Sequence, residues 1–71
     1  MKKFNKGDKV KIGLNASSPY RGHTGIVQTE IVKASSRIVY CVKLDLKDFT
    51  LFYQFREKDI ELVRKNEHVL V

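Results

Sequence analysis

Two pieces of sequence decide the fold: Lys6-Gly-Asp-Lys-Val-Lys-Ile12 and Tyr20-Arg-Gly-His-Thr-Gly-Ile-Val-Gln-Thr-Glu-Ile31. In the first piece, a Gly-Asp turn signal stands directly before alternating basic and apolar residues, which is the pattern of a half-buried strand. In the second, paired glycines precede a run of β-forming residues. The loop between them is rich in Asn, Ser, Pro and Gly. We therefore expect a bent opening unit of two short strands, on which the rest of the chain closes as a small barrel.

Further strands follow at the short spacing that is typical of small barrels. Residues 38–44 are the clearest, because β-branched and aromatic side chains predominate there. A polar step at residues 56–59 has about the length of a single 3₁₀ turn. No stretch shows a helical period of apolar residues, so the prediction is an all-β chain. The five strands are expected at residues 8–14, 23–33, 38–44, 49–55 and 60–63.

Alternation also assigns each strand a core face and an outer face. In the opening strand it places Val10 and Ile12 inside and Lys9 and Lys11 outside, with Phe4 as an apolar anchor beneath the strand. Three further sets of residues are each expected to share one face of a strand. The first is Val27, Thr29 and Ile31. The second set lies in the third strand and is expected to face the core: Ile38, Tyr40, Val42 and Leu44. The third set shares one face of the fourth strand: Phe49, Leu51, Tyr53 and Phe55.

Length and composition limit the class of protein. The 71 residues make one domain, and we expect the barrel at residues 4–63 and a tail at 64–71 that could add an edge strand. The single cysteine, Cys41, excludes an intrachain disulfide and a zinc site built from cysteines. No apolar run has the length of a signal peptide core or of a membrane span. A cytoplasmic protein is therefore expected.

The net charge of +6 is concentrated in one half of the chain. Residues 1–36 carry seven Lys or Arg against two acids, whereas residues 37–71 carry seven against six. A basic patch of this kind attracts polyanions, of which nucleic acid is the commonest. Two alternatives stay open: a charged surface that serves only solubility, and an acidic protein partner.

The segments Gly7–Ile12 and Tyr20–Val27 resemble the KOW motif, which occurs in SH3-like barrels of ribosomal proteins and transcription-elongation factors. The segment Phe55–Val63 is similar to the way many SH3-like barrels close, with a 3₁₀ turn before the last strand. The resemblance covers residues 4–63. It implies a five-stranded SH3-like barrel and a nucleic-acid partner, with RNA favoured over DNA.

Two departures point to a different family. Residues 15–18 lack the lysine run that is common in ribosomal members, and the third and fourth strands are longer and more aromatic than a minimal KOW unit. In that respect the chain also resembles SH3-like accessory subunits such as the variable subunit of ferredoxin–thioredoxin reductase. That resemblance implies a docking surface for a larger protein complex, without chemistry of its own.

The candidate nucleic-acid site lies on the opening unit. Cationic side chains would neutralise phosphates, and an aromatic ring would stack on an unpaired base. The alternative for Tyr20 is that it anchors its loop by packing on the rim of the barrel. The alternative for Arg21 and His23 is that they are ordinary solvated loop residues. The candidate residues are Lys9, Lys11, Tyr20, Arg21 and His23.

A second candidate surface is an apolar strip for a protein partner. If the other aromatic residues of the fourth strand face inward, Phe52 faces outward beside Val39 and Cys41. The alternative is that residues 69–71 fold back and cover this strip. Cys41 lies in the middle of an apolar strand and the two histidines are far apart, so we expect no enzyme, no metal or other cofactor, no small-molecule substrate and no membrane contact.

Overall fold

The computed structural model describes residues 4–33 and 37–66. Its five strands form one antiparallel sheet, and a 3₁₀ turn precedes the last strand. The predicted fold class is confirmed as a small all-β chain of five strands with this turn before the last strand, and every strand boundary lies within two residues of the predicted one. The elements are β1 (Lys9–Ile12), β2 (Thr24–Val32), β3 (Ile38–Asp45), β4 (Thr50–Arg56), η1 (Glu57–Asp59) and β5 (Ile60–Arg64).

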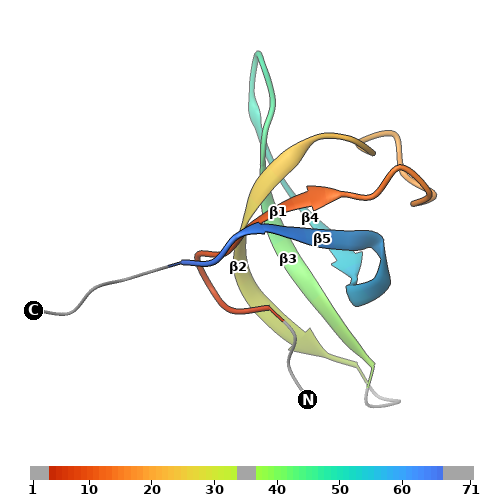
Figure 1. Cartoon of the computed structure of the whole chain (residues 1–71), viewed down its shortest axis with the longest axis vertical. Helices are drawn as coiled ribbons and strands as arrows, with labels where there is room; N and C mark the ends of the chain where they lie inside the picture. Colours follow the sequence, from red (N-terminus) through yellow and green to blue (C-terminus); the bar gives the residue numbers. More distant parts are fainter. Residues whose placement is uncertain (1–3, 34–36, 67–71) are drawn as a thin grey trace, which may run out of the picture.

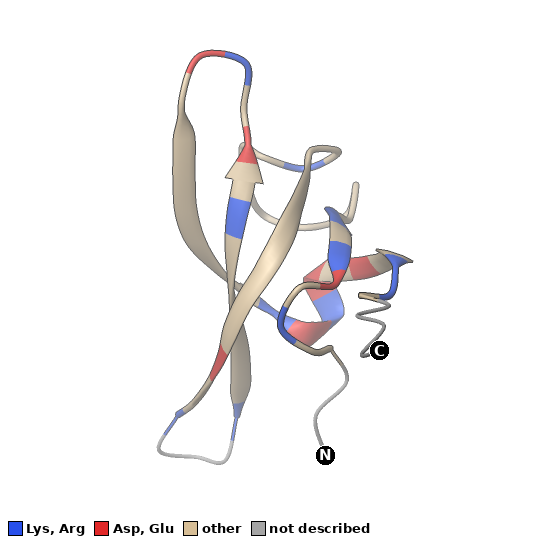
Figure 2. Cartoon of the chain, turned by 90° about the vertical axis from the view of Figure 1, so that its left-hand side faces the viewer, with Lys and Arg blue, Asp and Glu red and all other residues tan. Residues whose placement is uncertain are grey.

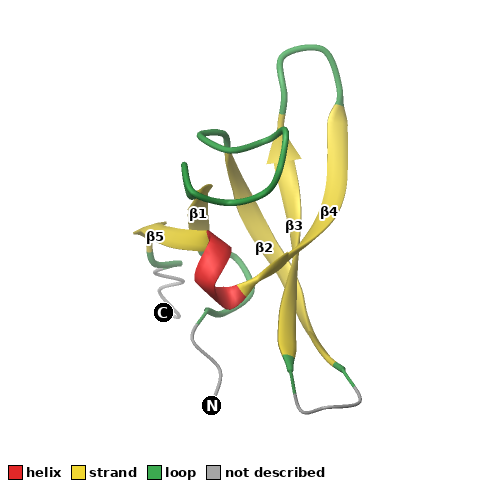
Figure 3. Ribbon diagram, turned by 90° about the vertical axis from the view of Figure 1, so that its right-hand side faces the viewer, coloured by secondary structure: helices red, strands yellow, loops and turns green. Residues whose placement is uncertain are grey.

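The strand order in the sheet is β4-β3-β2-β1-β5, so the last strand returns to pair with the first (Figure 1). The long strands β2, β3 and β4 run together, and the β3–β4 hairpin projects beyond the rest of the chain (Figure 1). The short strands β1 and β5 lie at a steep angle to them (Figure 3). The sheet therefore bends round one core, and in the described part of the chain its two edges, β4 and β5, are not bonded to each other.

The core gathers side chains from the sheet and from the segment before it. Phe4 is 2% exposed; its backbone N–H donates to the hydroxyl of Tyr40 at 3.3 Å, and the two rings meet edge to face at 5.2 Å. The expected anchoring role of Phe4 is thereby confirmed. The buried apolar residues are Phe4, Val10, Ile12, Ala16, Val27, Val39, Tyr40, Val42, Leu44, Phe55 and Ile60.

The opening turn explains why the sequence has Gly-Asp before β1. Gly7 adopts a positive φ of 92°, and its N–H donates to the carbonyl of Val27 at 2.8 Å. The carboxylate of Asp8 is 1% exposed and accepts two backbone hydrogen bonds, from Asn5 at 3.0 Å and from Asn66 at 2.8 Å. The turn is thus held from both ends of the described chain.

The two glycines before and in β2 have different functions. Gly22 has a positive φ of 88°, which suits the turn that leads into the strand. Gly25 is needed for space, because a Cβ there would lie 2.6 Å from the carbonyl oxygen of Lys43 and equally close to the side chain of Val42. β2 and β3 therefore approach each other as closely as their backbones allow at this point.

A β-bulge corrects one expectation about β2. Val27 pairs with Val42 and Thr29 pairs with Cys41, so Gln28 is the extra residue and the register shifts there. Val27 consequently faces the core, whereas Thr29 faces outward and is exposed. The predicted common face of Val27, Thr29 and Ile31 is wrong, because the alternation on which it relied is interrupted by the bulge.

β4 is an edge strand, and its burial is lower than the sequence suggests. Leu51, Tyr53 and Phe55 do share the core-side face, but only Phe55 is buried. Tyr53 is 46% exposed, and Phe49, which precedes the strand, is 59% exposed. The aromatic residues at positions 49 and 53 are therefore accessible to solvent, in contrast to the predicted core face.

Residues 4–33 and 37–66 contain no helix that is both long and apolar enough to cross a bilayer. Residues 1–3, 34–36 and 67–71 lie outside the described residues, so the suggested extra edge strand at the carboxyl end lies outside them too.

Candidate nucleic-acid interface

The basic residues of β1 lie on the outer face of the barrel. Val10 and Ile12 are fully buried, and strand alternation places Lys9 and Lys11 on the opposite face. Lys11 is exposed and Lys9 is half-buried between neighbouring strands. This part of the predicted surface is arranged as expected.

The register extends this surface across the whole sheet. Lys9 pairs with Arg64 of β5 on one side and with Ile26 of β2 on the other. Ile26 pairs in turn with Lys43 of β3, which pairs with Phe52 of β4. Residues directly opposite each other in an antiparallel sheet project from the same face. We call this set the outer-face row; it consists of Arg64, Lys9, Ile26, Lys43 and Phe52.

The outer-face row combines cations with exposed apolar groups. It holds three cations and no acid, while Ile26 is 36% exposed and Phe52 is 57% exposed. The row spans four inter-strand spacings, roughly 19 Å along a curved surface. The neighbouring pair is less favourable to an anion, because Lys11 lies opposite Glu61. Figure 2 shows charged residues at the hairpin tip and around β1, η1 and β5, with few along β2–β4.

Arg21 and His23 are both exposed on the loop that leads into β2. The carbonyl of His23 accepts a hydrogen bond from the N–H of Ile12 at 2.8 Å, which places His23 beside the end of β1. Arg21 turns back on its own loop, where its Nη1 donates to the carbonyl of Ser18 at 3.5 Å. Both residues therefore adjoin the Lys11 end of the predicted site without belonging to the row.

Tyr20 lies on the other side of the sheet. Its ring meets Tyr53 edge to face, with centroids 5.6 Å apart, and Tyr53 shares the core-side face with Val42. The N–H of Tyr20 also donates to the hydroxyl of Ser18 at 3.1 Å. This arrangement is that of a loop anchor on the rim of the barrel. Tyr20 is not brought together with Lys9 and Lys11.

The predicted apolar strip is not formed as expected. Phe52 is exposed on the outer face, but its partner on β3 is Lys43. Val39 pairs with Arg56 and is only 7% exposed, since Ile31 flanks it on β2 and the turn η1, which follows Arg56, packs against β3. Val39 is therefore buried on the outer side of β3, apart from the main core cluster, and offers no exposed contact to a partner.

Three residues of the outer-face row were not among the predicted site residues: Ile26, Lys43 and Arg64. A signal for Lys43 was present, because it alternates with the core residues Val42 and Leu44. Alternation gives the face of a residue but not its neighbours on other strands. Only the register shows that the lysines of β1 and β3 lie in one row.

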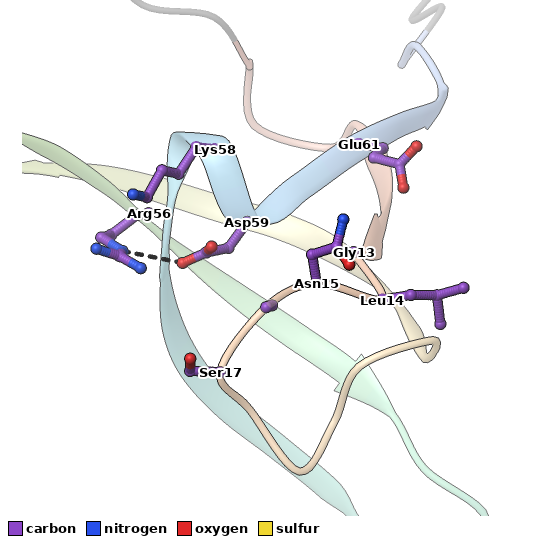
Figure 4. A pocket seen from close by; sticks show the side chains of 9 residues that line it. Gly13, Leu14, Asn15, Ser17, Arg56, Lys58, Asp59 and Glu61 are labelled. Carbon is purple, nitrogen blue, oxygen red and sulfur yellow. Dashed lines mark hydrogen bonds and ion pairs between the residues drawn. The ribbon is translucent and has the colours of Figure 1, made fainter.

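An open cleft of about 640 Å³ lies between the β1–β2 loop and η1 (Figure 4). Figure 4 shows Arg56 and Asp59 facing each other there, and their ion pair joins Nε to Oδ2 at 3.0 Å. Lys58 and Glu61 also line the cleft, so both signs of charge are mixed. This mixture gives a polyanion no net attraction. Within the described residues, no three side chains of the kinds that hold metals are grouped.

No family model, no curated protein and no solved structure matches this chain. A functional assignment therefore depends on the surface of the chain, of which the outer-face row is the most distinctive part.

Proposed function

We propose that this chain is a non-catalytic cytoplasmic module that binds single-stranded nucleic acid, RNA in preference to DNA, on the outer face of its sheet. The observation that carries the proposal is the outer-face row, in which Lys9 and Lys43 lie on either side of Ile26 and Phe52 ends the row. The resemblance of the opening unit to the KOW motif supports the same partner.

The chemistry of the row suits a single strand. Cations spaced along a surface neutralise successive phosphates, and the counterions that are released make binding strongly dependent on salt. An exposed aromatic ring at the end of such a surface gives a platform on which an unpaired base can stack. Phe52 meets this requirement, since more than half of its surface is accessible. A duplex would offer phosphates but no free base to Phe52.

A second function has its own supporting observation. Phe49 and Phe52 are 59% and 57% exposed, a large apolar surface for such a small chain. This supports the alternative that the chain is a structural or regulatory subunit that docks on a larger protein complex through its aromatic strand. Docking of that kind would survive high salt and would be lost in Phe52→Ser, whereas Lys43→Glu would leave it nearly unchanged.

The deciding experiment is an NMR titration of backbone amides with short single-stranded RNA and DNA, at about 50 mM and about 200 mM salt. We expect saturable shifts at Lys9, Ile26, Lys43 and Phe52. Lys43→Glu should weaken binding at least tenfold, because it replaces an attraction to phosphate with a repulsion.

The matched control is Lys58→Glu, which makes the same change in net charge in the mixed-charge cleft. It should weaken binding far less than Lys43→Glu. Equal effects of the two variants would mean that net charge alone attracts the nucleic acid. Absence of shifts at the lower salt concentration would refute the proposed function.

A further inference from the structure

The two edges of the sheet are protected to very different degrees. Exposed edge strands pair readily with other strands, and proteins usually protect them with charges, bulges, prolines or short lengths. β5 has three of these features: it is five residues long, it carries Glu61 and Arg64, and its pairing with β1 contains a register shift. The β5 edge is therefore a poor template for another strand.

β4 has only one of these protections, the charge of its last residue, Arg56. It is seven residues long, and its pairing with β3 runs without a register shift from Thr50 to Arg56. Residues 50–55 include no charge, glycine or proline. Phe52 and Tyr53 are 57% and 46% exposed, one on each face of the strand. Such an edge is suited to accept a further strand.

We propose that the β4 edge pairs with β4 of a second copy of this chain, antiparallel and centred on Phe52. In this register Phe52 of one copy lies opposite Phe52 of the other on the outer face, where two aromatic rings form a favourable cross-strand pair. On the core-side face, Leu51 lies opposite Tyr53 of the second copy. In the dimer, the exposed side chains of β4 in one copy are thus covered by those of β4 in the other copy.

Charge complementarity favours a second copy as the occupant. The same register places Asp48 of each copy opposite Arg56 of the other, so an acid and a base meet at both ends of the contact. Asp48 is exposed, and the side chain of Arg56 is 49% exposed beside Asp59. No like charges lie opposite each other in this pairing.

The net charge of +6 does not prevent the contact. The nearest equivalent lysines, Lys43 of the two copies, are separated by three inter-strand spacings, roughly 14 Å, which exceeds the Debye length at physiological salt. Pairing would also join the two outer-face rows end to end at Phe52. Because Phe52 belongs both to the row and to the contact, the dimer is tested in the absence of nucleic acid.

The test is sedimentation velocity on the whole chain without nucleic acid, from about 10 μM to about 1 mM. We expect a reversible monomer–dimer equilibrium that Phe52→Lys weakens at least tenfold, since it places two lysines opposite each other. Leu62→Lys is the control, because it introduces the same charge at a half-exposed leucine on the β5 edge. It should leave the equilibrium unchanged.

A charge exchange tests the register independently of stacking by Phe52. Asp48→Lys should weaken the dimer about 2- to 30-fold through the two symmetric pairs, and adding Arg56→Glu should restore it. In a mixed-label NMR sample we expect intermolecular contacts between Leu51 of one copy and Tyr53 of the other. A chain that stays monomeric at the highest concentration, or a dimer that is lost in Leu62→Lys and not in Phe52→Lys, would overturn the proposal.

Discussion

The carboxylate of Asp8 accepts a hydrogen bond from the backbone N–H of Asn66 at 2.8 Å, across 58 positions of sequence. Its other oxygen accepts from the N–H of Asn5 at 3.0 Å. One buried side chain thus joins the segment before β1 to the segment after β5. The Gly-Asp pair before β1 therefore stabilises the fold, and any function of the opening strands depends on that stability.

Asp8→Ala should destabilise the fold by about 2–4 kcal/mol, because two buried backbone donors lose a charged acceptor. Asp45→Ala is the matched control, since Asp45 is exposed at the end of β3. The free energy of unfolding of both variants can be measured by urea titration. A loss of stability in Asp8→Ala no larger than that in Asp45→Ala would contradict the structural role of the carboxylate.

Gly25→Ala should lower the melting temperature by about 10 °C or more, as overpacking of a close backbone contact costs about 1–3 kcal/mol or more in a domain of this size. The added methyl group would lie 2.6 Å from the Lys43 carbonyl oxygen, whereas at Gly13 it would meet its nearest neighbour at 3.4 Å. Gly13→Ala is therefore the control, and its melting temperature should change by only a few degrees. Thermal unfolding followed by circular dichroism measures both.

The fold could be predicted from the sequence because its signals are local. The Gly-Asp turn, the alternation of Val10 and Ile12 with lysines, and the polar step before Ile60 each depend on neighbouring residues. The predicted strand bounds therefore lie within two residues of those in the structure. The bulge at Gln28 could not be predicted in this way, since nothing in the local pattern distinguishes an extra residue from a paired one.

The candidate site was predicted only in part, because a surface depends on register. Alternation showed that Lys9 and Lys43 face outward, but their alignment with Ile26 between them depends on how β1, β2 and β3 pair. Burial of Val39 depends likewise on Ile31 and η1, which are distant in sequence. Pairing between residues that are distant in sequence cannot be predicted from a local sequence pattern.

Binding to single-stranded RNA should weaken about twentyfold between about 50 mM and about 200 mM salt, if Lys9, Lys43 and Arg64 each neutralise one phosphate. A logarithmic plot of affinity against salt should then have a slope of about −2, and Lys43→Gln should reduce its magnitude by about 0.7. Fluorescence anisotropy with a labelled oligonucleotide measures the slope. An unchanged slope in Lys43→Gln would mean that Lys43 makes no phosphate contact.

The two aromatic residues Tyr20 and Phe52 should respond in opposite ways to truncation. Tyr20→Ala removes an edge-to-face contact with Tyr53, so it should lower stability by about 1–2 kcal/mol and leave RNA affinity nearly unchanged. Phe52→Ala removes an exposed ring that stacks on a base, so it should weaken RNA binding roughly 5- to 150-fold with little effect on stability.

Urea unfolding and anisotropy, applied to both variants at protein concentrations where the chain is monomeric, separate the two effects. If Tyr20→Ala lost affinity as strongly as Phe52→Ala, the stacking surface would lie on the rim beside Tyr53, on the side of the sheet opposite Lys9 and Lys43. The loop from Gly13 to His23 would then be the part of the chain that meets the base, and the outer face would contribute phosphate contacts alone.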